Sequence, residues 1–112
     1  MYLTEAALAA TLAELGGLAQ GTEMVADYML PAEMRDEDGS TYAEQVAPVA
    51  AGRGEPWLTF LSPGEASELL AAHGMEPAEH VHQRDAVDAA LWRRSDSLRP
   101  IDLSMLARAR VI

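Results

Sequence analysis

The sequence predicts a single α/β layered domain, and three observations support this fold class. Segments with helical periodicity alternate with strand-like segments, in the order helix, strand, irregular segment, helix, strand, helix, strand. Apolar residues make up 49% of the chain, which favours a packed core over disorder. The length of 112 residues suits one small domain with a single core.

The first predicted helix lies within residues 4–17. Thr4 is a suitable N-cap, and Glu5 places a negative charge near the positive end of the helix dipole. Gly16-Gly17 ends the helix, and three leucines recur on one of its faces: Leu8, Leu12 and Leu15. The next segment, 22–30, is short, apolar and contains valine and tyrosine, so it predicts a strand buried on both faces.

The segment 31–62 predicts an irregular, lid-like region. Residues 35–40 (RDEDGS) have the composition of a charged loop. A helix around 41–51 is compatible with the sequence, but Pro48 is expected to disturb it.

A capping-box pattern predicts the next helix. Ser62 can act as N-cap, Pro63 suits the first helical position, and Glu65 lies at the third. The helix is expected to run to His73, with Gly74 as its left-handed end.

The C-terminal third predicts two more strands with a helix between them. Segment 75–82 is placed at a sheet edge because Pro77 cannot donate to a ladder. Residues 84–94 predict an amphipathic helix with Val87, Ala90 and Leu91 facing inward. Segment 103–112 alternates as a strand does, with one face formed by Met105, Ala107, Ala109 and Val111.

Charge and composition exclude several classes of function. The formal net charge is -10 and no run of basic residues occurs, so binding to nucleic acid or to an anionic membrane is not expected. The chain has no cysteine, which excludes disulfides, thiolate metal sites and cysteine nucleophiles. Since neither a signal peptide nor a membrane-spanning stretch is evident, we expect a cytoplasmic protein.

Several phrases together resemble one protein family. They are "MYLTEAALAATLAEL" at the start, "GTEMVADYMLP" at 21–31, "GEPWLTFLSPGEASELLAAHGMEPAEHV" at 54–81 and "LARAR" at 106–110. In this order they resemble the class I S-adenosylmethionine-dependent methyltransferases related to leucine carboxyl methyltransferase. The resemblance covers almost the whole chain.

The resemblance implies a fold for each part of the chain. The family has a Rossmann-like sheet of seven strands with helices on both faces, and the antiparallel seventh strand lies between the fifth and the sixth. Segments 22–30, 75–82 and 103–112 would be the fifth, sixth and seventh strands. Residues 1–112 would then form one partial domain, the C-terminal half of the methyltransferase sheet with its flanking helices.

The cofactor-binding elements of the family have no counterpart in this sequence. Similar proteins bind S-adenosyl-L-methionine through a glycine-rich turn, an acidic residue after the second strand and a Glu-Gly pair before the "MYL" phrase. The G-x-G at 52–54 follows no predicted strand and lacks a third glycine. We therefore expect Met1 to correspond to an internal methionine of a longer ancestor, and this chain alone not to bind the cofactor.

Ligands of open α/β sheets bind beyond the carboxyl ends of the strands, where the resemblance places three candidates. Tyr2 is the candidate for the cofactor pocket, with ordinary packing at a helix start as the alternative. Asp27 and Tyr28 are candidates for substrate binding near the end of the fifth strand. Asp27 lies in an apolar run, so it is expected to be a buried carboxylate. It would contact the substrate or act as a general base, or else accept hydrogen bonds from the following turn.

Further candidates lie in the connection to the sixth strand and on that strand. Trp57 and Phe60 fall where the family builds substrate lids, and a helix staple or a core plug is the alternative. His80 and His82 share a strand face and have a spacing that can bind a metal, but a solvated face is favoured and no metal site is predicted.

Two functions from different classes follow. The first is an S-adenosylmethionine-dependent methyltransferase that acts on an oxygen or carboxylate of a small-molecule acceptor, with this chain alone inactive. The second is a non-catalytic remnant or an interaction module, which self-associates through the exposed edge of strand 22–30.

Overall fold

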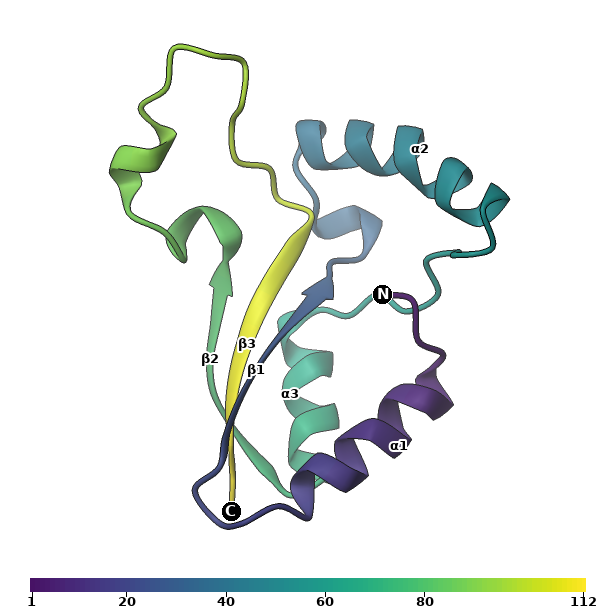
Figure 1. The fold of residues 1–112 in the computed structure, drawn as a ribbon, viewed down its shortest axis with the longest axis vertical. Helices are drawn as coiled ribbons and strands as arrows, with labels where there is room; N and C mark the ends of the chain where they lie inside the picture. Colours follow the sequence, from purple (N-terminus) through teal and green to yellow (C-terminus); the bar gives the residue numbers. More distant parts are fainter.

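The computed structural model describes residues 1–112 and shows a mixed α/β fold with one antiparallel sheet (Figure 1). The three strands lie in the order β1-β3-β2, so β1 and β2 run in the same direction on either side of β3. The strands are β1 (Glu23–Met29), β2 (Met75–His82) and β3 (Ser104–Val111), and the helices are α1 (Glu5–Gly16), α2 (Glu37–Gly52) and α3 (Pro63–Ala72). The predicted α/β class and the three predicted strands are confirmed, including β2 at an edge.

The helices α1 and α3 begin and end as the sequence predicts. Thr4 Oγ1 accepts a hydrogen bond from the backbone N–H of Ala7 at 3.1 Å. In α3, Glu65 N–H donates to Ser62 Oγ at 3.2 Å and Ser62 N–H donates to Glu65 Oε2 at 2.8 Å, which completes the capping box. Gly74 has a φ of 77°, as a left-handed helix end requires.

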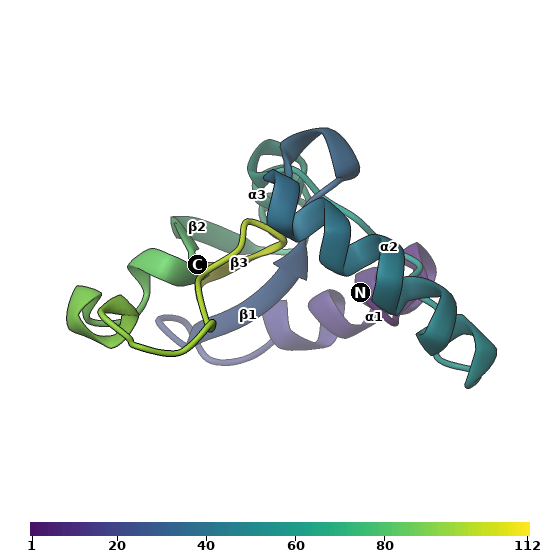
Figure 2. The ribbon, with the colours of Figure 1, turned by 90° about the horizontal axis from the view of Figure 1, so that it is seen from above.

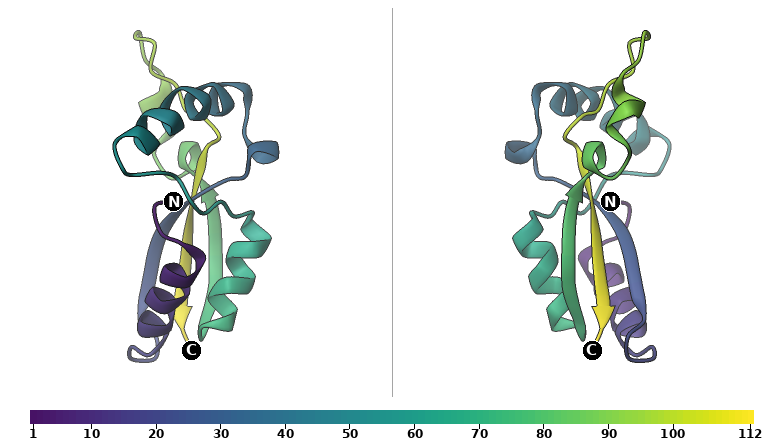
Figure 3. Two further views of the ribbon diagram at one scale, coloured as in Figure 1. Left: turned by 90° about the vertical axis from the view of Figure 1, so that its right-hand side faces the viewer. Right: turned by 90° about the vertical axis from the view of Figure 1, so that its left-hand side faces the viewer.

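One face of the sheet carries the main core. The face of β3 that was predicted to be apolar is buried, and Leu12 of α1 and Leu70 of α3 pack on it. Helices α1 and α3 therefore lie on the same face, as the two views of Figure 3 show.

The other face of the sheet carries charged pairs and no helix covers it (Figure 3, right). Arg110 of β3 forms an ion pair with Glu23 at 2.6 Å, and Arg108 lies 3.7 Å from Glu79. Val25 of β1 is 65% exposed on this side. The expectation that strand 22–30 is buried on both faces is therefore wrong. An uncovered face also differs from the two-sided cover that the resemblance implies.

Helix α2 replaces much of the expected irregular region and crosses the carboxyl end of β1 (Figures 1 and 2). Asp36 is its N-cap, with Gly39 N–H donating to Asp36 Oδ1 at 2.7 Å. The acidic residues of 35–40 thus belong to a helix start, where they interact favourably with the dipole, and the loop prediction is wrong. The helix continues through Pro48, because Pro48 and Glu44 are both exposed and water can hydrate the carbonyl of residue 44.

The helix predicted for residues 84–94 is not formed. The chain instead makes two short 3-10 helices, η2 (Gln83–Asp85) and η3 (Ala89–Trp92), in a long excursion between β2 and β3 that projects from the sheet (Figure 1). Val87 and Leu91 are 42% and 55% exposed. An amphipathic pattern forms a helix mainly where its apolar face can be buried, and this excursion has no such surface.

The molecule is thin for its length. Its radius of gyration is 15.4 Å, whereas a compact chain of this length has about 13 Å. Only 15 of the 112 residues are buried, so the core is small and much sheet surface faces solvent.

Candidate functional site

A cavity of about 430 Å³ lies where β1 ends and β3 begins. We call it the strand-end cavity. Its walls come from the residues before α1, the end of β1, helix α2, the segment 53–62 and the excursion before β3. The lining residues are Met1, Tyr2, Asp27, Met29, Tyr42, Val46, Trp57, Gln83, Trp92, Leu98, Arg99, Pro100, Ile101, Leu103 and Ser104.

Three of the five predicted site residues, Tyr2, Asp27 and Trp57, meet at this cavity. Tyr2 precedes α1 and is 51% exposed. Its neighbours are held by the segment 58–59. The carbonyl of Met1 accepts hydrogen bonds from the N–H groups of Leu58 and Thr59 at 2.8 and 3.2 Å, and Thr59 Oγ1 donates to the carbonyl of Leu3 at 2.6 Å.

Asp27 differs from the expectation. It lies on the uncovered face of β1, paired in register with Leu106, and its side chain is exposed. It makes no hydrogen bond or ion pair, and Tyr28 next to it points to the opposite face. The expectation of a buried carboxylate is wrong because the apolar run around it faces two different environments. Asp27 is nevertheless the one carboxylate that lines the strand-end cavity.

Trp57 packs beside a small apolar cluster at the strand ends, formed by Met29, Ala43 and Leu103. Its indole Nε1 is buried and has no hydrogen-bond partner. Buried polar groups are almost always hydrogen-bonded, so this N–H is free to donate to a bound molecule or to water.

Tyr28 and Phe60 do not reach the strand-end cavity. The Tyr28 hydroxyl lies 2.9 Å from His80 Nδ1 on the core face, and His80 Nε2 lies 2.7 Å from Ser67 Oγ. Burial raises the pKa of Tyr28 above its ordinary value. Phe60 stacks beneath Arg35, whose guanidinium carbon is 5.2 Å from the ring centre. The structure does not bring Tyr28 and Phe60 to this cavity, and their role in substrate binding stays a prediction. His80 is bonded within the fold rather than solvated as expected.

Two aromatic residues of the cavity were missed by the sequence analysis, Tyr42 and Trp92. Tyr42 lies on α2, and the indole N–H of Trp92 donates to the carbonyl of Arg84 at 3.0 Å. Both belong to segments whose structure was predicted incorrectly. The sequence offered one signal for them: each is a large aromatic residue in a segment whose structural role the sequence did not make clear.

A charged cluster next to the cavity connects two of its walls, and it consists of Asp36, His82, Arg84 and Asp102. Arg84 donates to Asp102 Oδ1 at 2.8 Å and to Asp36 Oδ2 at 3.2 Å. Asp102 also lies 3.3 Å from His82 Nδ1, without hydrogen-bond alignment. The hydrogen bond from the Gly39 N–H, followed by the backbone N–H of residue 102 and Arg84, lowers the pKa of Asp36. This cluster ties the start of α2 to the end of the excursion.

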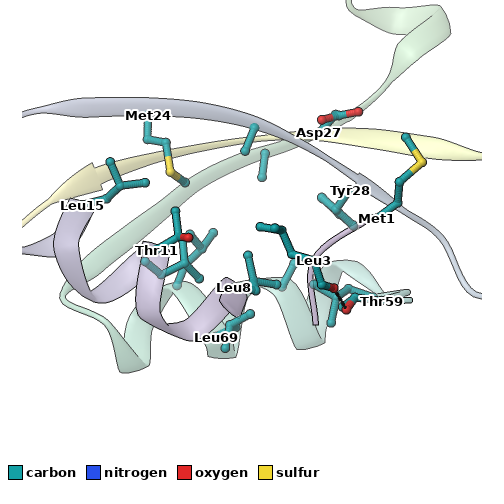
Figure 4. Close-up of a pocket in the computed structure, with 16 residues that line it drawn as sticks. Met1, Leu3, Leu8, Thr11, Leu15, Met24, Asp27, Tyr28, Thr59 and Leu69 are labelled. Atoms are coloured by element: carbon teal, nitrogen blue, oxygen red, sulfur yellow. Dashed lines mark hydrogen bonds between the residues drawn. The ribbon is translucent and has the colours of Figure 1, made fainter. Parts of the chain in front are cut away.

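A second cavity, of about 280 Å³, lies between α1 and the covered face of the sheet (Figure 4). Its lining is mostly apolar, with Leu15 and Met24 at one side and Leu8 and Leu69 together at another. In Figure 4 the carboxylate of Asp27 points away from these side chains. Tyr28 also lines this cavity, but its hydroxyl is engaged with His80, so the cavity offers mainly shape and apolar surface.

The structure has neither a metal-binding cluster nor a membrane-spanning helix. No group of three or more His, Asp or Glu side chains is placed to hold a metal ion. None of the helices combines the length and the apolar composition that a membrane span needs.

Comparisons with protein-family models, with curated proteins and with solved structures gave no match. The class of protein must therefore be argued from the fold and the site.

Proposed function

We propose that the chain forms the acceptor-binding part of an S-adenosylmethionine-dependent methyltransferase that acts on an oxygen or carboxylate of a small molecule. The observation that carries this proposal is the sheet order β1-β3-β2 with an antiparallel central strand. It is the order that the resemblance implies for a fifth, seventh and sixth strand. The strand-end cavity lies at the carboxyl end of β1, where open α/β sheets bind ligands.

The residues present do not make a complete cofactor site. No glycine-rich turn follows a strand, since Gly52 to Gly54 end α2 on an exposed surface. Asp27 is the only carboxylate that lines the cavity, so it alone could make the contacts that require a negative charge. Elements that hold the cofactor would have to come from outside residues 1–112, which agrees with the thin, one-sided sheet.

The chain's own residues have a limited task in such a reaction. S-adenosyl-L-methionine supplies an electrophilic methyl group, and its transfer is an in-line displacement that depends on positioning. Tyr2, Tyr42 and Trp57 would restrict the acceptor and exclude water from it. A base is needed only if the acceptor must lose a proton, and Asp27 is the group available for this.

A complementation experiment tests the proposal. The chain would be mixed with the separately produced N-terminal half of an intact methyltransferase of the resembling family, and calorimetry with S-adenosyl-L-methionine would follow. We expect no micromolar binding by either part alone and micromolar binding by the mixture. Transfer of a labelled methyl group to a panel of carboxylates and phenols would then identify the acceptor. Micromolar binding by this chain alone, or a mixture that neither associates nor binds, contradicts the proposal.

A second candidate function, self-association, is favoured by the free edge of β1. Leu30 N–H donates to the carbonyl of Leu103, and Val111 N–H donates to the carbonyl of Thr22. The backbone N–H and C=O groups of the even-numbered residues of β1 therefore point toward β3. The backbone groups of Glu23, Val25 and Asp27 therefore point outward without strand partners. Leu61 N–H occupies the carbonyl of Met29, so the free edge ends there. Such an edge is a template for another strand.

Charge selects one register for pairing two copies of β1. If Ala26 of each copy lies on the two-fold axis, Val25 faces Asp27 of the second copy and no like charges are directly opposite. Registers shifted by one residue pair place Asp27 against Asp27 or Glu23 against Asp27, which is destabilising.

Sedimentation at several concentrations tests this candidate. Val25→Glu is expected to prevent association, because it places a carboxylate directly opposite Asp27 of the second copy. Val49→Glu on α2 is the matched control, because Val49 is also an exposed valine, at 53%. A monomer at all concentrations, or equal association of both variants, contradicts pairing through β1.

A further inference from the structure

We infer that the strand-end cavity binds a small organic cation, specifically an ammonium compound with an apolar body. The inference deepens the proposed function by naming the chemical class of the acceptor, and it rests on that function only for the methyl-transfer step. The binding itself is argued from the lining of the cavity.

The lining is unusually aromatic for this chain. The sequence contains two tryptophans and three tyrosines, and four of these five line the cavity: Tyr2, Tyr42, Trp57 and Trp92. They come from four separate parts of the chain. Aromatic faces carry negative potential and attract ammonium groups, most strongly where water is partly excluded.

The charge of the lining also favours a cation. Asp27 has no hydrogen bond or ion pair, so its negative charge is uncompensated. Arg99 is the only cationic side chain in the lining, and its Nε lies 3.4 Å from Asp38 Oδ2 outside the cavity. The nearby Asp36 and Asp102 are both paired with the single Arg84. The net charge of -10 on the whole chain favours the approach of cations over that of anions.

Apolar side chains complete the lining, among them Met29, Ile101 and Leu103. A ligand that has an ammonium group for Asp27 and the rings, and an apolar body for these side chains, matches the lining.

Intrinsic fluorescence is a direct assay, because both tryptophans of the chain line the cavity. Choline is the probe, and its neutral isostere 3,3-dimethylbutanol, with carbon in place of nitrogen, is the control ligand. We expect saturable quenching by choline with an affinity at least about ten-fold higher than that of the isostere. We also expect choline binding to weaken as salt is added.

Three variants test the assigned roles. Asp27→Asn is expected to weaken choline binding several-fold and to reduce the preference over the isostere to the part that the aromatic rings supply. Glu44→Gln, at an exposed carboxylate of α2 that has no partner and does not line the cavity, should leave both values unchanged. Trp57→Phe should weaken choline and tetramethylammonium to a similar extent, several-fold, because phenylalanine makes a weaker cation–π contact than tryptophan. Circular dichroism of each variant verifies folding.

Equal affinity for choline and the isostere overturns the inference, as does an Asp27→Asn variant that binds like the wild type or an absence of saturable quenching. The measurement needs neither S-adenosyl-L-methionine nor methyl transfer. Choline binding without any methyl transfer after complementation would therefore sink the proposed function and leave this inference standing. Methyl transfer only to neutral acceptors would instead support the proposed function and overturn this inference.

Discussion

Replacing Gly39 by alanine is expected to destabilise the fold, although alanine normally stabilises a helix interior. Gly39 is buried in the first turns of α2 against the backbone of Asp102. A Cβ at this position would overlap the carbonyl oxygen of Asp102 and would lie 2.9 Å from its carbonyl carbon. These are backbone atoms and cannot rotate away. The Cβ would also lie 2.9 Å from Asp36 Oδ1, which accepts the Gly39 N–H.

The magnitude follows from two opposing effects. Alanine in place of glycine favours the helix by about 1 kcal/mol. Overpacking costs about 1–3 kcal/mol, and contact with rigid backbone places this site near 3 kcal/mol. We therefore expect Gly39→Ala to lower the free energy of unfolding by about 2 kcal/mol.

A control lies in the same helix. A Cβ at Gly52 would meet no heavy atom within 4 Å, so Gly52→Ala should be neutral or should stabilise by up to about 1 kcal/mol. Urea unfolding followed by far-UV circular dichroism measures both variants. If Gly39→Ala unfolds at the same or a higher urea concentration than the wild type, α2 does not pack on residue 102. The position of α2 as a wall of the strand-end cavity would then be contradicted.

Three further outcomes are expected. Asp36→Ala removes the N-cap of α2 and should lower the free energy of unfolding in urea by about 1 kcal/mol, whereas Asp36→Asn should retain most of it. The folded-state pKa values of Asp36 and Glu65 lie below their unfolded values, through bonds from Gly39 N–H and Ser62 N–H. Their stabilisation is therefore present above about pH 4 and lost as the pH falls through the folded pKa values. Thermal unfolding at decreasing pH should show this loss, and Asp36→Asn should show less of it. Ser67→Ala leaves His80 Nε2 without its partner and should cost about 1–3 kcal/mol in urea unfolding. An unchanged midpoint would show that water replaces the hydroxyl.

The elements that were predicted correctly are specified either by residues close together in the sequence or by a strict alternation of apolar and polar residues. The capping box at Ser62 depends on residues three positions apart, and it appears in the structure with both of its hydrogen bonds. In β3 the alternation from Met105 to Val111 specifies which face is buried.

The errors arise where the surroundings decide the structure. Asp36 has the same composition signal in a loop and at a helix start, and its partner Arg84 lies 48 residues away in the chain. Residues 84–94 have an amphipathic pattern, but the fold provides no surface for the apolar side.

The candidate site was predictable only in part, for a related reason. Tyr2, Asp27 and Trp57 could be placed together because the order of strands implied by the resemblance brings their segments to one end of the sheet. The alternation of side chains along β1 would have been enough to separate Tyr28 from the strand-end cavity, because its side chain points to the face opposite that of Asp27. Tyr42 and Trp92 depend on α2 and on the excursion, whose positions follow from long-range contacts.

The central position of β3 determines when the sheet can form. Glu23 is bonded to Arg110 across 87 positions of sequence, and both β1 and β2 have β3 as their only strand neighbour. During synthesis neither strand can pair with β3 until residues 104–111 have been made, so the apolar segment of β1 stays open while residues 30–103, which separate β1 from β3, are added. Such a chain is expected to fold late and slowly and to need protection from aggregation in the meantime. A stop codon anywhere before residue 104 would leave a polypeptide with no sheet at all.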